Sequence, residues 1–125
     1  MITPQYLLDT NIAIYLMEGT APAAVQRLEA CPLGSVVTSS ICLAEILMGT
    51  GPAGRPVLDA LLAQIAVLPF DEAAARAYAT IPFRRRSFDR LIGAHALALD
   101  LTIITASSID FADIPGLRVE DWTQP

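Results

Sequence analysis

The stretch YLLDTNIAIYLMEG, residues 6–19, decides the fold of this chain. Its apolar run Tyr6–Leu8 is too short for a helix and is typical of a buried strand. Any of the polar residues 9–11 can cap a helix, which the apolar spacing then predicts over Ile12–Glu18. A strand that leads directly into a helix is a β–α unit, and the carboxylate of Asp9 lies at the junction of the two elements.

The same alternation of strand and helix signals continues along the chain. Further strands are expected at residues 36–38, 67–70, 101–105 and 117–119. Further helices are expected from Pro22, over 41–48, over 57–66, from 71 to Pro82 and from 87 or 88 to about 100, with a loop over 51–56. Strands that alternate with helices form a parallel sheet covered on both faces. The sequence therefore predicts one α/β domain over residues 1–125, with three layers and a central parallel sheet of four to five strands.

Four acidic residues, Asp9, Glu45, Asp89 and Asp110, end or interrupt apolar runs. A buried carboxylate is costly unless it pairs, binds a cation or protonates. Partners are scarce, because the chain has no lysine, eight arginines and one histidine. The carboxyl ends of parallel strands share one edge of a sheet, where ligands bind, so these side chains can converge there. This pattern predicts a pocket for Mg²⁺, or Mn²⁺ in its place, and metal-assisted phosphate chemistry.

The charge balance bears on nucleic-acid binding. The formal net charge is −5, which by itself argues against a nucleic-acid partner. Bound metal would neutralise several of the negative charges. The positive charge is clustered in Arg84, Arg85, Arg86 and Arg90, beside Asp89. The first three are either contacts for RNA phosphates or part of a solvated loop.

Composition limits partners and location. Hydrophobic residues make up 54% of the chain and charged residues 17%. The apolar surplus covers either a partner interface, which favours a dimer, or a tightly packed monomer. The N-terminus lacks a signal-peptide pattern, and no apolar run reaches the roughly 20 residues of a membrane span. We expect a cytoplasmic protein with no membrane contact.

His95 shares an apolar stripe with Leu91, Ile92 and Leu99 and is expected to be a core residue.

Five motifs in order resemble the PIN-domain ribonucleases, and most closely the VapC-type toxins of bacterial toxin–antitoxin pairs. They are LLDTN (7–11), AEILMG (44–49), FDRLIGAHAL (88–97), TASSIDF (105–111) and PGLRVEDW (115–122). The resemblance implies a PIN-like fold and a metal-dependent endoribonuclease that cuts tRNA or rRNA. It also implies a homodimer that forms a hetero-oligomer with a cognate VapB-type antitoxin and meets DNA only through that antitoxin.

The resemblance assigns roles by position. Asp9 and Asp89 match metal ligands, and Glu45 matches a glutamate that holds the metal directly or through water. Asp110 matches the acidic residue that precedes a phenylalanine in the VapC branch. Many PIN domains place an aspartate where this chain has Ser107, and the segment before Phe88 is shorter than usual.

Supporting residues are expected around these acids. Thr10 and Asn11 either orient Asp9 or a metal-bound water, or only cap the following helix. Ser107 is a further candidate for this supporting role. Arg84–Arg86 and Arg90 are the candidate contacts for RNA or antitoxin.

Three rival classes remain. A haloacid-dehalogenase-like phosphatase requires a second aspartate where this chain has Asn11, and it also requires a lysine. A response-receiver domain lacks support for the same reason, since the chain has no lysine. The third rival is a catalytically inactive PIN-like binding module, which Ser107 keeps open.

Overall fold

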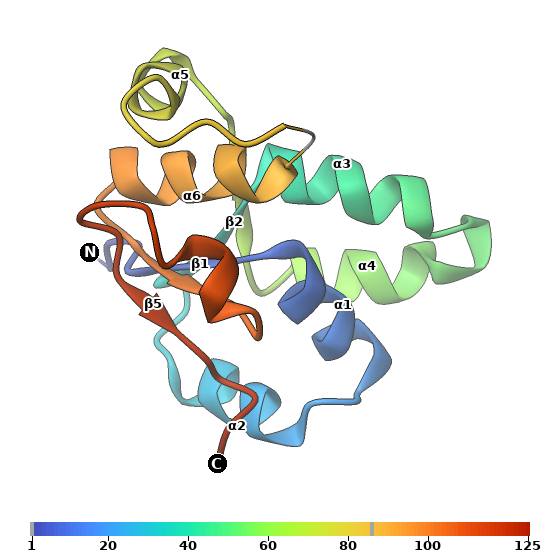
Figure 1. Ribbon diagram of the computed structural model, residues 1–125. Coiled ribbons are helices and arrows are strands. Elements are labelled where there is room, and N and C mark those ends of the chain that lie inside the picture. The colour runs from blue at the N-terminus through green and yellow to red at the C-terminus, as the bar shows by residue number, and fades with distance from the viewer. Residues whose placement is uncertain (1, 86) are drawn as a thin grey trace.

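The computed structural model describes residues 2–85 and 87–125, and within them five parallel strands form one sheet (Figure 1). The strands are β1 (Tyr6–Leu8), β2 (Val36–Ser39), β3 (Ala66–Leu68), β4 (Thr102–Ile104) and β5 (Val119–Glu120). Their order across the sheet is β3-β2-β1-β4-β5, so β1 is central. Leu7 pairs with Val37 on one side and with Ile103 on the other. The predicted parallel α/β sheet is confirmed.

Helices connect the strands. They are α1 (Thr10–Glu18), α2 (Pro22–Ala30), α3 (Ser40–Gly49), α4 (Arg55–Leu62), α5 (Glu72–Tyr78) and α6 (Phe88–Ala98), with short 3-10 turns η1 (Pro52–Gly54) and η2 (Ser108–Phe111). Side chains cap three of them: Asp9 accepts from the Ile12 amide at 2.9 Å, and Ser39 and Asp71 act in the same way at α3 and α5. None of the described helices is long and apolar enough to cross a membrane.

The alternation of side chains along the strands builds two cores. Leu8, Val36 and Ile104 pack with buried residues of α1, α2 and α4. Their neighbours Leu7, Val37 and Ile103 pack instead with α6 and the segment after η2. Successive strand residues point to opposite faces, so both faces are covered and three layers result. Figure 1 shows α5 and α6 above the strands and α2 below them.

Several expected boundaries were wrong. The loop expected over 51–56 is shorter, because η1 occupies Pro52–Gly54 and α4 already begins at Arg55. Proline fits the first turn of a helix, where its missing N–H needs no partner. The helix α4 ends at Leu62 rather than at 66, and α5 ends at Tyr78, ahead of Pro82. Leu99 lies beyond the end of α6 and is 39% exposed, so it does not belong to the buried stripe.

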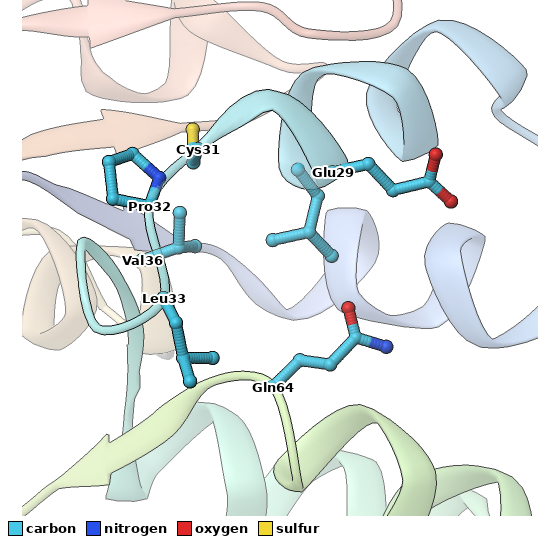
Figure 2. Close-up of a pocket in the computed structure, with 7 residues that line it drawn as sticks. Glu29, Cys31, Pro32, Leu33, Val36 and Gln64 are labelled. Atoms are coloured by element: carbon cyan, nitrogen blue, oxygen red, sulfur yellow. The ribbon is translucent and has the colours of Figure 1, made fainter.

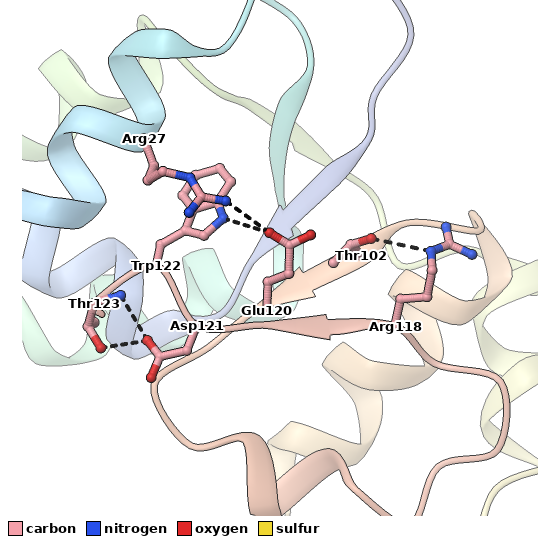
Figure 3. A network of polar contacts seen from close by, with 7 residues as sticks. All are labelled: Arg27, Thr102, Arg118, Glu120, Asp121, Trp122 and Thr123. Atoms are coloured by element: carbon pink, nitrogen blue, oxygen red, sulfur yellow. Dashed lines mark hydrogen bonds and ion pairs between the residues drawn. The ribbon is translucent and has the colours of Figure 1, made fainter. Parts of the chain in front are cut away.

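The last residues are held by a polar network around β5 (Figure 3). Glu120 Oε1 accepts from Arg27 Nη2 at 3.1 Å and from Trp122 Nε1 at 3.2 Å. Trp122 is buried, and its ring contacts Tyr6 edge-on, with 5.1 Å between the ring centroids. The Arg27 guanidinium also lies over the Trp122 ring. The PGLRVEDW motif therefore closes the edge of the sheet and takes no direct part in the carboxylate site.

Candidate active site

Asp9 lies at the carboxyl end of the central strand. Its backbone N–H donates to the Ile104 carbonyl at 3.0 Å, so the residue sits between the ends of β1 and β4. Its side chain is 4% exposed and caps α1 through the Ile12 amide. One carboxylate thus serves both as a helix cap and as the innermost acid of the site.

Glu45 reaches the same region from α3. Its Oε1 accepts a hydrogen bond from Thr10 Oγ1 at 2.6 Å, and the glutamate is half-buried. Thr10 is expected to orient Asp9 or only to cap a helix, but its hydroxyl contacts Glu45 instead. Asn11, its neighbour in the DTN motif, is exposed in the first turn of α1.

The acids act on one another electrostatically. The pKa of Asp9 is raised to about 6, mainly by burial and also by the charges of Asp89 and Glu45. Hydrogen bonds from Thr105 and the Ile12 amide oppose this rise. Burial also raises the pKa of Asp89, as do the charges of Asp110 and Glu45, while Arg90 lowers it. Asp9, Glu45 and Asp89 are therefore close enough to act on one another electrostatically, and Asp110 acts on Asp89 in the same way.

Asp110 and Ser107 belong to the turn after β4. Asp110 is exposed within η2, and its N–H donates to the Ser107 carbonyl at 2.9 Å. The Ser107 N–H donates to Thr105 Oγ1 at 3.0 Å. Ser107 thus shapes the backbone that presents Asp110. Its expected role in supporting a metal ligand stays a prediction.

The basic residues differ from expectation. Arg90 is 1% exposed, and its Nη2 donates to Asp113 Oδ1 at 2.5 Å. The prediction that Arg90 contacts RNA or antitoxin directly is corrected, because its side chain is buried in an ion pair. Arg84 is exposed and also contacts Asp113, at 3.2 Å, and Arg85 is exposed. Arg86 lies outside the described residues.

Asp113, the carboxylate that pairs with Arg90, was not singled out from the sequence. Its contact with Arg90 is the main reason that its pKa is lowered from the usual value. Nothing near it in sequence indicates a buried cation, since Arg90 is distant along the chain.

His95 is buried, as predicted. Its Nδ1 lies 2.8 Å from Ser39 Oγ, and its ring meets Phe70 edge-on. Burial lowers its pKa below the ordinary value, which favours the neutral ring at neutral pH. His95, a residue of α6, therefore contacts Ser39, the residue that caps α3, within the core.

The donor set fits a hard divalent cation. Carboxylate oxygens are the ligands that Mg²⁺ and Mn²⁺ prefer. The pKa values of Asp9 and Asp89 are raised first by burial and then by neighbouring acids, and a bound cation would stabilise both charges. The oxygens do not form a finished coordination shell: among residues 2–85 and 87–125, no three His, Cys, Asp or Glu side chains have the spacing of a metal site. The assignment of Asp9, Glu45 and Asp89 as ligands stays a prediction.

A separate pocket lies near the amino end of β2 (Figure 2). Its volume is about 260 Å³, and it is lined by Leu28, Glu29, Cys31, Pro32, Leu33, Val36 and Gln64. None of the predicted site residues that the structure describes lines it. Because Val36 begins the strand whose other end leads into α3, this pocket is remote from the carboxylates.

Comparison with known proteins assigns the family. The PIN domain model matches residues 6–117. A tRNA(fMet)-specific endonuclease VapC from Shigella flexneri is 31% identical over 131 residues, covering 95% of this chain and 98% of that protein. The structure of VapBC2 from Rickettsia felis bound to a DNA fragment from their promoter matches with a TM-score of 0.82 and 26% identity, covering 97% of this chain and 99% of that chain. VapBC-1 from nontypeable Haemophilus influenzae matches with a TM-score of 0.80 and 28% identity, covering 98% and 100%. The chain belongs to the PIN domain family, within its VapC branch.

Proposed function

We propose that this chain is a metal-dependent endoribonuclease, the toxin of a VapBC-type pair, and that it hydrolyses phosphodiester bonds of tRNA or rRNA. The observation that carries the proposal is the group of carboxylates at the carboxyl ends of β1, β2 and β4, two of them raised in pKa by burial and by their acidic neighbours. The similarity to a VapC that is named as specific for tRNA(fMet) makes tRNA the first substrate to test.

Asp9, Asp89 and Glu45 are the residues that would hold Mg²⁺ or Mn²⁺. When bound, such a cation supplies charge stabilisation for the phosphate and a nucleophilic water at neutral pH. Asp9 is fixed by its cap to α1, and Glu45 is oriented by the Thr10 hydroxyl. Preorganised oxygens of this kind keep their places when the substrate arrives.

Asp110 and Glu45 are candidates for either of two roles in the reaction. Either carboxylate can complete the donor set or accept the proton of the attacking water, since both lie close enough to Asp89 to raise its pKa. Arg85, exposed before α6, provides positive charge for the RNA backbone at the edge of this site. His95 is not needed as a base, because it is buried against Ser39.

A cognate VapB-type antitoxin is the proposed partner. The solved complexes named above pair VapB-type and VapC-type chains, one of them on promoter DNA, so we propose that this chain meets DNA only through its antitoxin. Leu33, Met48, Phe83 and Ile109 are 75% to 88% exposed. Exposed apolar side chains mark contacts with partner chains where they gather into a patch. We infer a homodimer that joins the antitoxin in a hetero-oligomer, in the cytoplasm with its RNA substrate.

The test is incubation of the purified chain with total RNA, in the presence of Mg²⁺ or Mn²⁺ and with a chelator, followed by mapping of fragment ends. Discrete fragments that require the cation are expected. The variant D9N should yield none while remaining folded. RNA binding without fragments in the wild type would instead identify the inactive binding module.

A further inference from the structure

An ion pair fastens the segment that carries Asp110 to the helix that carries Asp89. Arg90 Nη2 donates to Asp113 Oδ1 at 2.5 Å, and Arg84 Nη2 donates to the other oxygen of that carboxylate at 3.2 Å. Arg90 directly follows Asp89 on α6, and Asp113 follows the end of η2. The ion pair therefore joins the two segments that supply the Asp89 and Asp110 carboxylates.

Close packing extends this junction along α6. A Cβ at Gly93 would lie 2.7 Å from Ile114 Cδ1 and 3.3 Å from Phe111 Cδ1. Phe111 and Ile114 are both buried. The backbone of α6 thus approaches the segment 111–114 as closely as a glycine permits. The spacing between Asp89 and Asp110 depends on how this junction packs.

The ion pair is a poor source of stability. The Arg90 side chain is 1% exposed, and within the described part of the chain its Nε and Nη1 have no hydrogen-bond partner. A buried cation with unsatisfied donors costs free energy, and apolar replacement of a buried ion pair often leaves a protein equally or more stable. Stability alone therefore does not account for Arg90 at this position.

The position of Asp110 explains the need for an anchor. The strand β4 ends at Ile104, and Ser107, soon after it, supplies no carboxylate. The acidic residue that follows β4 is Asp110, which lies farther along the chain than Ser107 and is exposed. A side chain that far from the end of its strand is not placed by the sheet alone.

We propose that Arg90 and Asp113 are positioning residues, which hold Asp110 at the spacing from Asp89 that the cation site requires. The inference rests on the proposed function. This role requires neither residue to touch RNA or the cation. They act through Asp110, as outer partners orient the ligands of metal sites.

The test uses the double variant R90M/D113N, which removes both charges of the Arg90–Asp113 pair. Arg84, the other partner of Asp113, is exposed and loses only a surface ion pair. The matched control is E72Q/R76M, which removes an exposed ion pair on α5 in which both side chains are 78% exposed. Each protein is measured for thermal midpoint, for Mn²⁺ affinity by titration calorimetry, and for kcat and KM on cleaved RNA. In R90M/D113N we expect an equal or higher midpoint, Mn²⁺ affinity and kcat lower by about tenfold or more, and an unchanged KM. The control should change none of them.

A cycle of variants tests whether Arg90 and Asp113 affect Mn²⁺ affinity through Asp110. In a D110N background, R90M/D113N should cause no further loss of Mn²⁺ affinity, because the group that it positions is already altered. Asp113→Glu, which keeps the charge, should retain more of the affinity than Asp113→Asn.

Three results would overturn the inference. They are full Mn²⁺ affinity and kcat in R90M/D113N, losses that merely follow a lowered midpoint, and additive losses in the D110N background. A wild type that binds Mn²⁺ but cuts no RNA defeats the proposed function, while the Mn²⁺ titrations still decide the positioning role. A wild type that does neither overturns both.

Discussion

The Thr10 hydroxyl donates a 2.6 Å hydrogen bond to Oε1 of Glu45, across 35 positions of sequence. The contact joins the first turn of α1 to the middle of α3, two helices that begin at neighbouring strands. It holds a glutamate on an otherwise apolar helix in one orientation. The middle residue of the DTN motif therefore supports the acid of a different segment.

Replacement of Thr10 by valine removes this hydrogen bond and keeps the shape of the side chain. We expect Thr10→Val to lower kcat by about tenfold or more, as loss of an outer partner does at metal sites. The free energy of unfolding should change by less than about 1.5 kcal/mol, because Glu45 is only half-buried. Thr10→Ser, which keeps the hydroxyl, is the control. Full kcat in the valine variant would reject the orienting role.

Replacement of Asp9 by asparagine should stabilise the metal-free protein at neutral pH. The pKa of Asp9 is about 6 against an ordinary 3.8, so the folded state binds more protons than the unfolded state between those values. Its contribution to stability therefore falls as pH rises through this window. The shift corresponds to about 3 kcal/mol at most, and asparagine still caps α1.

Denaturant unfolding in chelator checks this prediction. At pH 7.5 Asp9→Asn should exceed the wild type in free energy of unfolding, and the difference should shrink as pH is lowered toward 4. Added Mg²⁺ should stabilise the wild type more than the variant, because ligands stabilise the state that binds them. Equal stabilities at pH 7.5 would mean that Asp9 is not a strained buried acid.

Alanine at Arg84, Arg85 and Arg86 should weaken RNA binding. Each lost phosphate contact lowers the dependence of log affinity on log salt by about 0.7 for a single strand. Filter binding across a salt series, with inactive D9N as the background, measures both quantities. The double variant R85A/R86A leaves the Arg84 contact with Asp113 in place. It therefore shows how far a loss of RNA affinity comes from lost positive charge alone and not from a loosened Asp113. An unchanged affinity and salt slope would assign these arginines to a solvated loop.

Substitution of His95 by alanine should affect stability and spare the chemistry. The side chain is buried, and its ring nitrogen is paired with Ser39 Oγ. We expect a loss of about 1–3 kcal/mol of unfolding free energy, with kcat unchanged well below the thermal midpoint. Loss of kcat in a fully folded His95→Ala protein would show that a histidine base takes part.

The sheet could be predicted because its signals are local. Leu7 and Leu8 precede an acid and a helix cap, and the same pattern of apolar run, polar cap and helix returns at β2. The start of α4 was placed too late because proline is tolerated in a first helical turn, where the sequence pattern indicates a loop.

The carboxylates were predictable from chain order, but their partners were not. The buried state of Arg90 had a signal that was overlooked: its neighbours at +3, +4 and +7 on α6 are Gly93, Ala94 and Leu97, a small and apolar face. Asp113 had no such signal, because it pairs across two segments that only the folded chain brings together.

End mapping of RNA fragments across a Mn²⁺ titration, for wild type and D9N side by side, tests the central claim most directly. The account predicts discrete cleavage that rises with Mn²⁺, disappears in chelator and is absent in D9N. Cleavage that persists in chelator, or a D9N protein that cuts as well as the wild type, would contradict it.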